Sequence, residues 1–187
     1  MTAADSRSPE PVGTGQVGTG QVSAGLEIRR VPITHPDAQR LIEEVQEFYV
    51  SLYGGRDESP IEPGYFDPPL GSFFVGHLDG EAVATGAWRM RPDVGAEFGW
   101  PRPAEIKRMY VVPAAQGRGL ARVMLAHLES TAAAAGATHM ILETGAPQTA
   151  AIGLYESSGY ERVTPFGHYR WSETNRCFAK SLPRASA

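Results

Sequence analysis

Residues 113–129, PAAQGRGLARVMLAHLE, place two glycines on either side of an arginine, between a β-branched run and an apolar helical pattern. The first turn of a helix that begins here presents unpaired amide groups and a partial positive charge. Gly117 and Gly119 leave that backbone bare, and Arg118 adds a charge that can pair with phosphate. The segment therefore predicts either an anion site that suits a pyrophosphate or a tight strand-to-helix turn that binds nothing.

The same segment lacks the signature of enzymes that hydrolyse nucleoside triphosphates. No lysine follows either glycine, and no serine or threonine is placed to hold magnesium. A second glycine pattern, Gly13-x-Gly15-x-x-Gly18, formally matches the dinucleotide-binding motif, but no strand precedes it and no helix follows it. An oxidoreductase that binds a nicotinamide dinucleotide through this pattern is therefore disfavoured.

The composition of the 187-residue chain is that of one ordinary globular domain. Hydrophobic residues make up 42% of it and charged residues 20%, and a net charge of -4 offers no broad basic surface to nucleic acid. The single cysteine, Cys177, cannot form an intrachain disulfide, and neither an apolar signal segment nor a membrane-spanning run is present. We therefore expect a cytoplasmic protein without nucleic-acid or membrane partners.

The chain divides into a tail and one domain. Residues 1–25 contain the pentapeptide VGTGQ twice and little that could be buried, so we expect a disordered low-complexity tail. Over residues 26–187, apolar periodicity predicts the element order β-α-β-β-β-α-β-α-β-β. This order is typical of an α/β or α+β fold, a mixed sheet with helices on its faces.

Turn residues set several boundaries within this domain. A predicted amphipathic helix follows Pro36 and ends at Gly54, and Asp79-Gly80 predicts a tight hairpin between strands at 72–78 and 81–90. The later predicted elements are a strand at 105–112, a helix that stops near Gly136, a strand at 138–143, a helix at 148–159, and strands at 160–163 and 175–182.

Two motifs in this order resemble the GNAT superfamily of acetyl-CoA-dependent N-acetyltransferases. QGRGLA at 116–121 is similar to its Q/R-x-x-G-x-G/A motif, and AAIGLYESSGY at 150–160 resembles a helix that ends in LYExxGF or LYExxGY. The resemblance covers residues 26–182. It implies a mixed sheet whose fourth and fifth strands, here 105–112 and 138–143, splay apart so that the pantetheine arm of acetyl-CoA lies between them.

By this resemblance, acetyl-CoA is the acyl donor and is bound largely by backbone groups. Met109 and Val111 would pair with the pantetheine amides, and the amides of 116–121 would bind the pyrophosphate. Gln148 stands where many relatives have an asparagine that contacts the pantetheine. The residues implied at the cofactor site are Met109, Tyr110, Val111, Gln116, Gly117, Arg118, Gly119, Leu120, Ala121 and Gln148.

Acetyl transfer to an amine needs a base, a polarised thioester carbonyl and a proton for the departing thiolate. The resemblance implies Glu105 or Glu143 as the general base, acting directly or through water. It implies Tyr155 as the general acid and the Val111 amide as the polarising group. Strand parity predicts that Glu105 faces the same side as Met109. The alternatives are a solvated strand-end glutamate at 105 and a merely packing aromatic at 155.

The acceptor is expected between the proline-rich loop at 53–70 and the segment TPFGHYRW at 164–171. Aromatic side chains there suit a small amine or an amino acid. The residues expected to bind it are Tyr53, Arg56, Phe166 and Tyr169. Lys107 and Arg108 could pair with an acceptor carboxylate, or could instead form a salt bridge with Glu97 or Glu105.

These patterns together predict an N-acetyltransferase that acts on the primary amine of a small molecule by direct attack in a ternary complex. The alternatives are a protein N-terminal or lysine acetyltransferase and a non-catalytic acyl-CoA sensor. The histidines show no metal-ligand spacing, so we expect no metal, and Cys177 is expected to be a buried residue rather than a nucleophile. The acceptor, the acyl chain length and the oligomeric state, for which a homodimer is one alternative, stay open.

Overall fold

The computed structural model describes residues 25–183. The tail predicted at 1–25, apart from Gly25, and residues 184–187 of the predicted domain lie outside this range. The elements along the chain are β1 (Leu26–Arg30), α1 (Pro36–Tyr53), β2 (Gly71–Leu78), β3 (Glu81–Met90), α2 (Pro92–Phe98), β4 (Pro103–Val111), α3 (Leu120–Ala134), β5 (His139–Gly145), α4 (Thr149–Ser157), β6 (Glu161–Val163) and β7 (Asn175–Ser181), with short 3₁₀ turns at Pro63–Phe66 and Pro113–Ala115.

The strands form one seven-stranded sheet in the order β1-β2-β3-β4-β5-β7-β6. Neighbouring strands are antiparallel, except that β4 and β5 run parallel. This confirms the predicted mixed sheet. The element order also agrees, but α2 replaces what the sequence predicts as an irregular connection. This helix begins at Pro92 and ends at Gly99, whose φ of 71° closes it, and its seven residues are too few to display a clear apolar period.

Two predicted boundaries depend on backbone conformations that few residues adopt. The helix α1 ends at Gly54, which has a φ of 79° and donates its N–H to the Val50 carbonyl. The hairpin between β2 and β3 turns at Asp79 and Gly80, with φ values of 51° and 85°. Positive φ at both positions is typical of the two-residue type I′ turn that Asp-Gly favours. Both predictions are confirmed.

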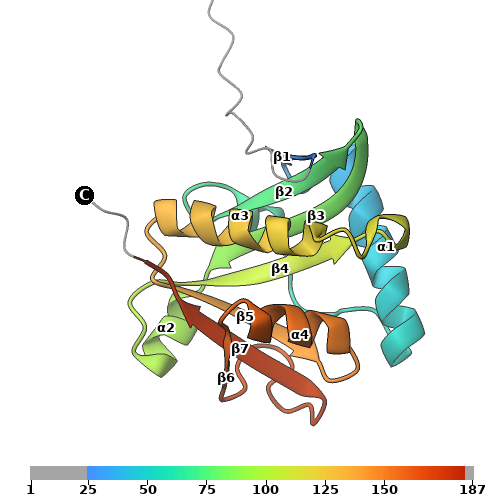
Figure 1. Ribbon diagram of the computed structural model, residues 1–187. Coiled ribbons are helices and arrows are strands. Elements are labelled where there is room, and N and C mark those ends of the chain that lie inside the picture. Colours follow the sequence, from blue (N-terminus) through green and yellow to red (C-terminus); the bar gives the residue numbers. More distant parts are fainter. Residues whose placement is uncertain (1–24, 184–187) are drawn as a thin grey trace, which may run out of the picture.

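Helices cover both faces of the sheet. Figure 1 shows α3 and α4 across one face, where they bury the largest apolar cluster, including Met124, Leu128 and Phe178. On the other face, α1 packs through Leu41 against β2, and α2 packs through Val94 in a separate cluster. The sheet therefore separates an α3/α4 layer from a layer that contains α1 and α2.

The sheet opens between its two parallel strands. Pairing of β4 with β5 is confined, within the described chain, to 103–105 against 139–141. Beyond this point β4 continues along β3 to Val111, while β5 continues along β7 to Gly145. A gap therefore separates the second half of β4 from the end of β5, which confirms the splay that the resemblance implied (Figure 1).

An extra residue in β4 breaks the alternation of its side chains between the two faces of the sheet. Arg108 has a φ of 51°, and the pairing register with β3 shifts by one residue at this point. Before this bulge Glu105 and Lys107 lie on the α1/α2 side, whereas after it Met109 joins the α3/α4 cluster. The parity prediction that Glu105 and Met109 share a face is therefore wrong, because a bulge breaks the two-residue period.

Two glycine substitutions test these backbone assignments. We expect Gly80→Ala to lower the free energy of unfolding by about 1 kcal/mol, because its φ of 85° is unfavourable for any residue with a Cβ. Gly153 lies in α4, and a Cβ there would meet no atom within 4 Å outside its own helix backbone and chain neighbours. We therefore expect Gly153→Ala to raise the free energy of unfolding by about 0.5 kcal/mol. Urea unfolding measures both, and equal effects of the two substitutions would contradict the assignment.

Candidate active site

The loop between β4 and α3 is held back against the end of β4. The Gln116 side-chain amide donates to the Val111 carbonyl oxygen at 3.0 Å. Gly117 and Gly119 have φ values of 74° and 76°, which explains why glycine stands at both positions. The tight turn that the sequence allowed is therefore present.

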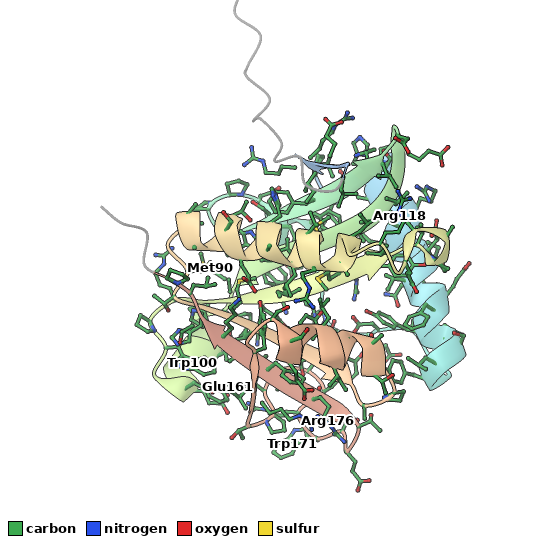
Figure 2. The ribbon with its side chains drawn as sticks, in the orientation of Figure 1. Met90, Trp100, Arg118, Glu161, Trp171 and Arg176 are labelled. Carbon is green, nitrogen blue, oxygen red and sulfur yellow. The ribbon has the colours of Figure 1, made fainter. Side chains whose placement is uncertain are left out.

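This loop also has backbone donors that find no partner among residues 25–183. Arg122 and Val123 donate their amides to the Gly119 carbonyl at 3.1 and 3.2 Å, so the amides of Leu120 and Ala121 precede the first intrahelical bond. The space around both loop glycines is open. Arg118 is exposed on the same loop (Figure 2). Donors, a positive helix end and a cation thus converge in a place that can accept an anion.

The edge of β4 beyond residue 105 presents backbone groups to the gap in the sheet. Val112 donates its amide to the Val83 carbonyl at 2.9 Å. Because backbone groups alternate in direction along an antiparallel pair, the N–H of Val111 points away from β3 and toward the gap. The side chains of Met109 and Tyr110 pack against opposite layers.

Two tyrosines with raised pKa values, Tyr155 and Tyr49, come from helices on opposite faces of the sheet. Tyr155 on α4 is buried against Tyr160 and Phe178, and burial raises its pKa, with a smaller contribution from Tyr49. Tyr49 belongs to α1 on the other face of the sheet, and burial raises its pKa to about 12. Tyr155 therefore packs as an aromatic and also keeps its proton near neutral pH, as a proton donor must.

Two cavities lie on the α1/α2 side of the sheet. The first, called here the α1 cavity, has a volume of about 690 Å³ and is lined by the end of α1, residues 55–58, the end of β5 and residues of the 169–175 segment. The second, the α2 cavity, has a volume of about 680 Å³ and is lined by α2, the end of β3 and residues of the 59–70 and 167–170 segments. Lys107 and Glu143 line both cavities, so the two meet at these side chains.

Three of the four predicted acceptor residues line the α1 cavity, namely Tyr53, Arg56 and Tyr169. Gln148, expected at the pantetheine, lines it too and donates its amide to the Tyr53 hydroxyl at 2.8 Å. Arg56 is bound to Glu43 by two hydrogen bonds of 2.7 and 2.6 Å.

The fourth predicted acceptor residue, Phe166, is placed differently. It is fully buried in the apolar cluster under α2, with Val94 and Ile141, and lines neither of the two cavities. The sequence could not reveal this burial because α2, which covers the cluster, was predicted as an irregular connection. The prediction that Phe166 contacts the acceptor has no support in this placement.

Asp57 fastens the loop after α1 to the rest of the site. Its carboxylate is ion-paired with Arg108 at the β4 bulge and accepts a hydrogen bond from the Tyr169 hydroxyl at 2.9 Å. Burial alone would raise the pKa of Asp57, but the charges of Arg108 and Lys107 hold it below the ordinary value. Arg108 therefore pairs with Asp57, and with neither of the two glutamates considered from the sequence.

Glu105 lies in a buried cluster of cations. Its Oε2 accepts hydrogen bonds from Arg89 Nε at 2.9 Å and Arg91 Nη1 at 2.6 Å. Its Oε1 lies 3.6 Å from Lys107 Nζ, so the salt bridge considered for Lys107 is confirmed. Burial would raise the pKa of Glu105, but these three cations lower it. The side chain is fully buried, so the alternative of a solvated strand-end residue is wrong.

Glu143 has the opposite environment. Burial raises the pKa of this carboxyl, and the charge of Glu105 raises it further. Its Oε1 accepts a hydrogen bond from the Asn175 side-chain amide at 3.0 Å. A Cβ at Gly167 would collide with the Glu143 carboxylate, so the backbone of the 164–171 segment lies directly against it. Glu143 is thus a carboxylate that binds protons more readily than usual and lines both cavities.

Four residues of the site were not predicted from the sequence: Arg89, Arg91, Tyr49 and Asn175. A signal for the two arginines was present, because Arg89-x-Arg91 and Glu105-x-Lys107 are both spaced by two residues on adjacent strands. Such pairs share one face of a sheet and can form cross-strand ion pairs. Tyr49 and Asn175 are positioned by tertiary contacts that carry no local pattern.

Other kinds of site are not supported by the described residues. Within residues 25–183, no group of three or more His, Cys, Asp or Glu side chains is arranged to hold a metal ion. No helix in that range combines the length and apolarity that crossing a bilayer requires. Cys177 is buried beside Phe166, and burial raises the pKa of its thiol to about 11, which is unfavourable for a nucleophile.

Comparison with known proteins agrees with this geometry. An IAA acetyltransferase of Azospirillum brasilense is 33% identical over 130 residues, which are 70% of this chain and 80% of that protein. The N-acetylaspartate synthetase of Homo sapiens is 30% identical over 113 residues, 60% of this chain but 35% of that protein. The structure is similar to that of a Klebsiella pneumoniae protein assigned to the acyl-CoA N-acyltransferases, with a TM-score of 0.69, 27% identity, and coverage of 86% of this chain and 99% of that chain.

A profile of the Acetyltransferase (GNAT) family matches residues 38–160. This range includes both motifs that the sequence analysis singled out, as well as the gap between β4 and β5 and the donors before α3. The chain therefore belongs to the GNAT family and is an acyl-CoA-dependent N-acetyltransferase.

Proposed function

We propose that the protein transfers an acetyl group from acetyl-CoA to the primary amine of a small molecule in a ternary complex. The observation that carries this proposal is that the α1 and α2 cavities meet at Glu143, close to the gap between β4 and β5. The gap runs along β4, whose edge beyond residue 105 is not paired with β5, and such an edge suits the amides of a pantetheine arm. The loop at 116–121 has the donors for the pyrophosphate, with Arg118 as an added cation.

In this reaction the amine nitrogen attacks the thioester carbonyl carbon. A C–N bond forms, the C–S bond breaks, and coenzyme A leaves as a thiolate. One proton must leave the amine and one must reach the thiolate. Glu143 accepts the first, directly or through water, and the Tyr155 hydroxyl donates the second. The Val111 amide donates a hydrogen bond to the thioester oxygen as negative charge develops there.

The environments of the two glutamates favour Glu143 over Glu105 as the base. Protonation of Glu105 would leave three buried cations without their shared counter-charge, which is costly in a low-dielectric site. Glu143, in contrast, has its pKa raised toward the operating range of a base and lines the cavities where an amine would bind. Two carboxylates with pKa values displaced in opposite directions suit different roles.

The fastened loop after α1 and the size of the cavities support a small acceptor rather than a protein. The loop after α1 is fastened by Asp57 to Arg108 and Tyr169, so it lies across the place where a peptide would need an open groove. Both cavities fall in the range of about 300–1,000 Å³ that small ligands occupy. A non-catalytic sensor would bind the coenzyme without releasing free thiol, so coenzyme A release with a panel of amines separates that alternative.

Binding of the donor can be tested without an acceptor. We expect acetyl-CoA at about a hundred times its dissociation constant to raise the free energy of unfolding by about 2.7 kcal/mol. Arg118→Ala should weaken binding about tenfold, because one charge-assisted contact is lost. Arg29→Ala, which removes an exposed β1 arginine paired with Glu27, is the matched control and should leave the affinity unchanged. Calorimetry measures all three, and an absence of heat with the parent protein at millimolar acetyl-CoA would reject the proposal.

The two assigned proton-transfer groups have nearly isosteric replacements. We expect Glu143→Gln and Tyr155→Phe each to lower kcat about a hundredfold or more. Glu143 must be deprotonated to act, so kcat/KM of the parent should rise as pH rises through the pKa of this group, which burial has raised above 4.5. The Glu143→Gln enzyme should lack this acidic limb. An unchanged limb in Glu143→Gln, or a Tyr155→Phe enzyme as fast as the parent, would remove the respective assignment.

Glu105 is expected to stabilise the fold rather than to move protons. Glu105→Gln should lower the free energy of unfolding by about 3 kcal/mol at pH 7, because three buried cations lose their carboxylate. Because the folded-state pKa lies below the ordinary value, this stabilisation is present above pH 4.5 and is lost as pH falls through the folded pKa. Urea unfolding over this range measures the difference.

The exposed pair of Glu97 with Arg170 provides the control for this measurement. Glu97→Gln should cost less than about 1 kcal/mol, as is usual for surface ion pairs. A Glu105→Gln protein that is as stable as the parent, but that has lost the acidic limb of kcat/KM, would exchange the roles assigned to Glu105 and Glu143.

A further inference from the structure

We propose that the acceptor is a small amine that also carries a carboxylate, and that Lys107 binds this carboxylate, assisted by Arg89, while the amine meets Glu143. The inference rests on the proposed function and narrows it to one class of substrate. It follows from how the charges around the meeting point of the two cavities are shared, from the hydrogen bonds that these charges lack, and from the pairing of the other cations nearby.

The cluster around Glu105 has more positive than negative charges. Arg89, Arg91 and Lys107 are its three cations. Arg91 also binds Asp93 through two hydrogen bonds of 2.9 and 2.7 Å, so the cluster contains two carboxylates. Within these direct ion pairs three cations share two carboxylates, while Asp57 and Glu143 also lie near enough for Lys107 to lower the pKa of each. Arg91 has Asp93 as a second partner, whereas Arg89 and Lys107 have Glu105 as their one ion-pair partner among the described residues.

Lys107 is the member of this cluster with unused hydrogen-bonding capacity. Only 9% of the residue is exposed, yet its Nζ makes the 3.6 Å ion contact with Glu105 and no hydrogen bond to another residue in the described range. The facing Glu105 Oε1 is buried and likewise has no hydrogen-bond partner among the described residues. An ammonium group has three donors, and Lys107 lines both cavities, so these donors can be reached from either one. An anionic oxygen in the cavities could accept hydrogen bonds from them.

Arg89 is held in position to assist. Its Nε donates to Glu105 and its Nη1 donates to the Pro60 carbonyl at 3.3 Å, while the guanidinium lies 5.0 Å from the centre of the Tyr65 ring. These contacts fix the side chain at the wall of the α2 cavity, where only 13% of it is exposed. A carboxylate bound by Lys107 on this side would therefore also lie in the field of a fixed guanidinium.

The other cations that line the cavities each have a carboxylate of their own. Arg56 is bound by Glu43, Arg91 by Asp93, and Arg170 by Glu97. The pairing of Arg56 makes it a weaker candidate for a substrate carboxylate than the sequence suggested. Glu143 is the anion that lines both cavities together with Lys107. A substrate with an amine for Glu143 and a carboxylate for Lys107 complements both, as an amino acid does.

The test compares acceptors that differ in the carboxylate alone. Glycine and glycinamide, and β-alanine and β-alaninamide, are matched pairs whose acetylation is followed by coenzyme A release. We expect kcat/KM to be at least about tenfold higher for the acid of each pair. Lys107→Met should raise KM for the acids about tenfold and leave KM for the amides within about twofold. This variant retains Arg89 and Arg91 as partners of Glu105, so it should fold. Arg29→Met removes an exposed charge and should match the parent.

A second measurement does not depend on turnover. Succinate carries carboxylates but no amine, and in the presence of coenzyme A it should raise the melting temperature of the parent protein but not that of Lys107→Met. Equal turnover of acids and amides, with no effect of succinate, would overturn the inference and leave the proposed function standing. Failure of every amine to release coenzyme A would instead reject the proposed function, and the succinate result would then decide by itself whether Lys107 forms an anion site.

Discussion

The arrangement of the site depends on one extra residue in β4, at Arg108. The bulge lets one strand serve both layers of the protein. Before it, Glu105 and Lys107 lie on the α1/α2 side, where Lys107 lines both cavities. After it, Met109 and Val111 join the α3/α4 cluster. A regular strand could not do both, because its side chains keep a two-residue period. The bulge also directs Arg108 to Asp57, which fastens the loop after α1 to the strand. An arginine at positive φ is unfavourable by itself, so these surrounding contacts must stabilise it.

Buried charge is used in two ways around this strand. Glu105 is surrounded by cations that keep it ionised, and its replacement would leave those cations uncompensated. Glu143 lies one strand away with fewer positive partners, so burial makes it a better proton acceptor. The two carboxylates are only one strand apart, and their repulsion contributes to the difference between them. Glu105, which we expect to stabilise the fold, therefore also raises the pKa of Glu143, which we propose as the base.

Much of the fold could be predicted from local patterns, and the splay came from the resemblance. Asp79-Gly80 and Gly54 predicted a hairpin and a helix end because few residues tolerate the required backbone angles. The bulge could not be predicted, since arginine at positive φ has no sequence signature. The short helix α2 was missed for lack of length, and Phe166 was therefore assigned to the acceptor although it lies in the core beneath that helix. For the site, the motifs indicated the loop and Tyr155, and the resemblance implied Glu105 or Glu143 as the base, whereas the partners of Glu105 required the cross-strand register.

The limited pairing between β4 and β5 has a mechanical consequence. The sheet consists of two blocks, one from β1 to β4 and one from β5 to β6, and three residue pairs join them along the sheet. The apolar cluster beneath α3 and α4 also holds them together, because both blocks contribute residues to it. An extended molecule inserted in the gap would add the backbone hydrogen bonds that the joint lacks, much as a missing strand would. Such a molecule would therefore make the rigidity of the whole domain depend on what occupies its centre.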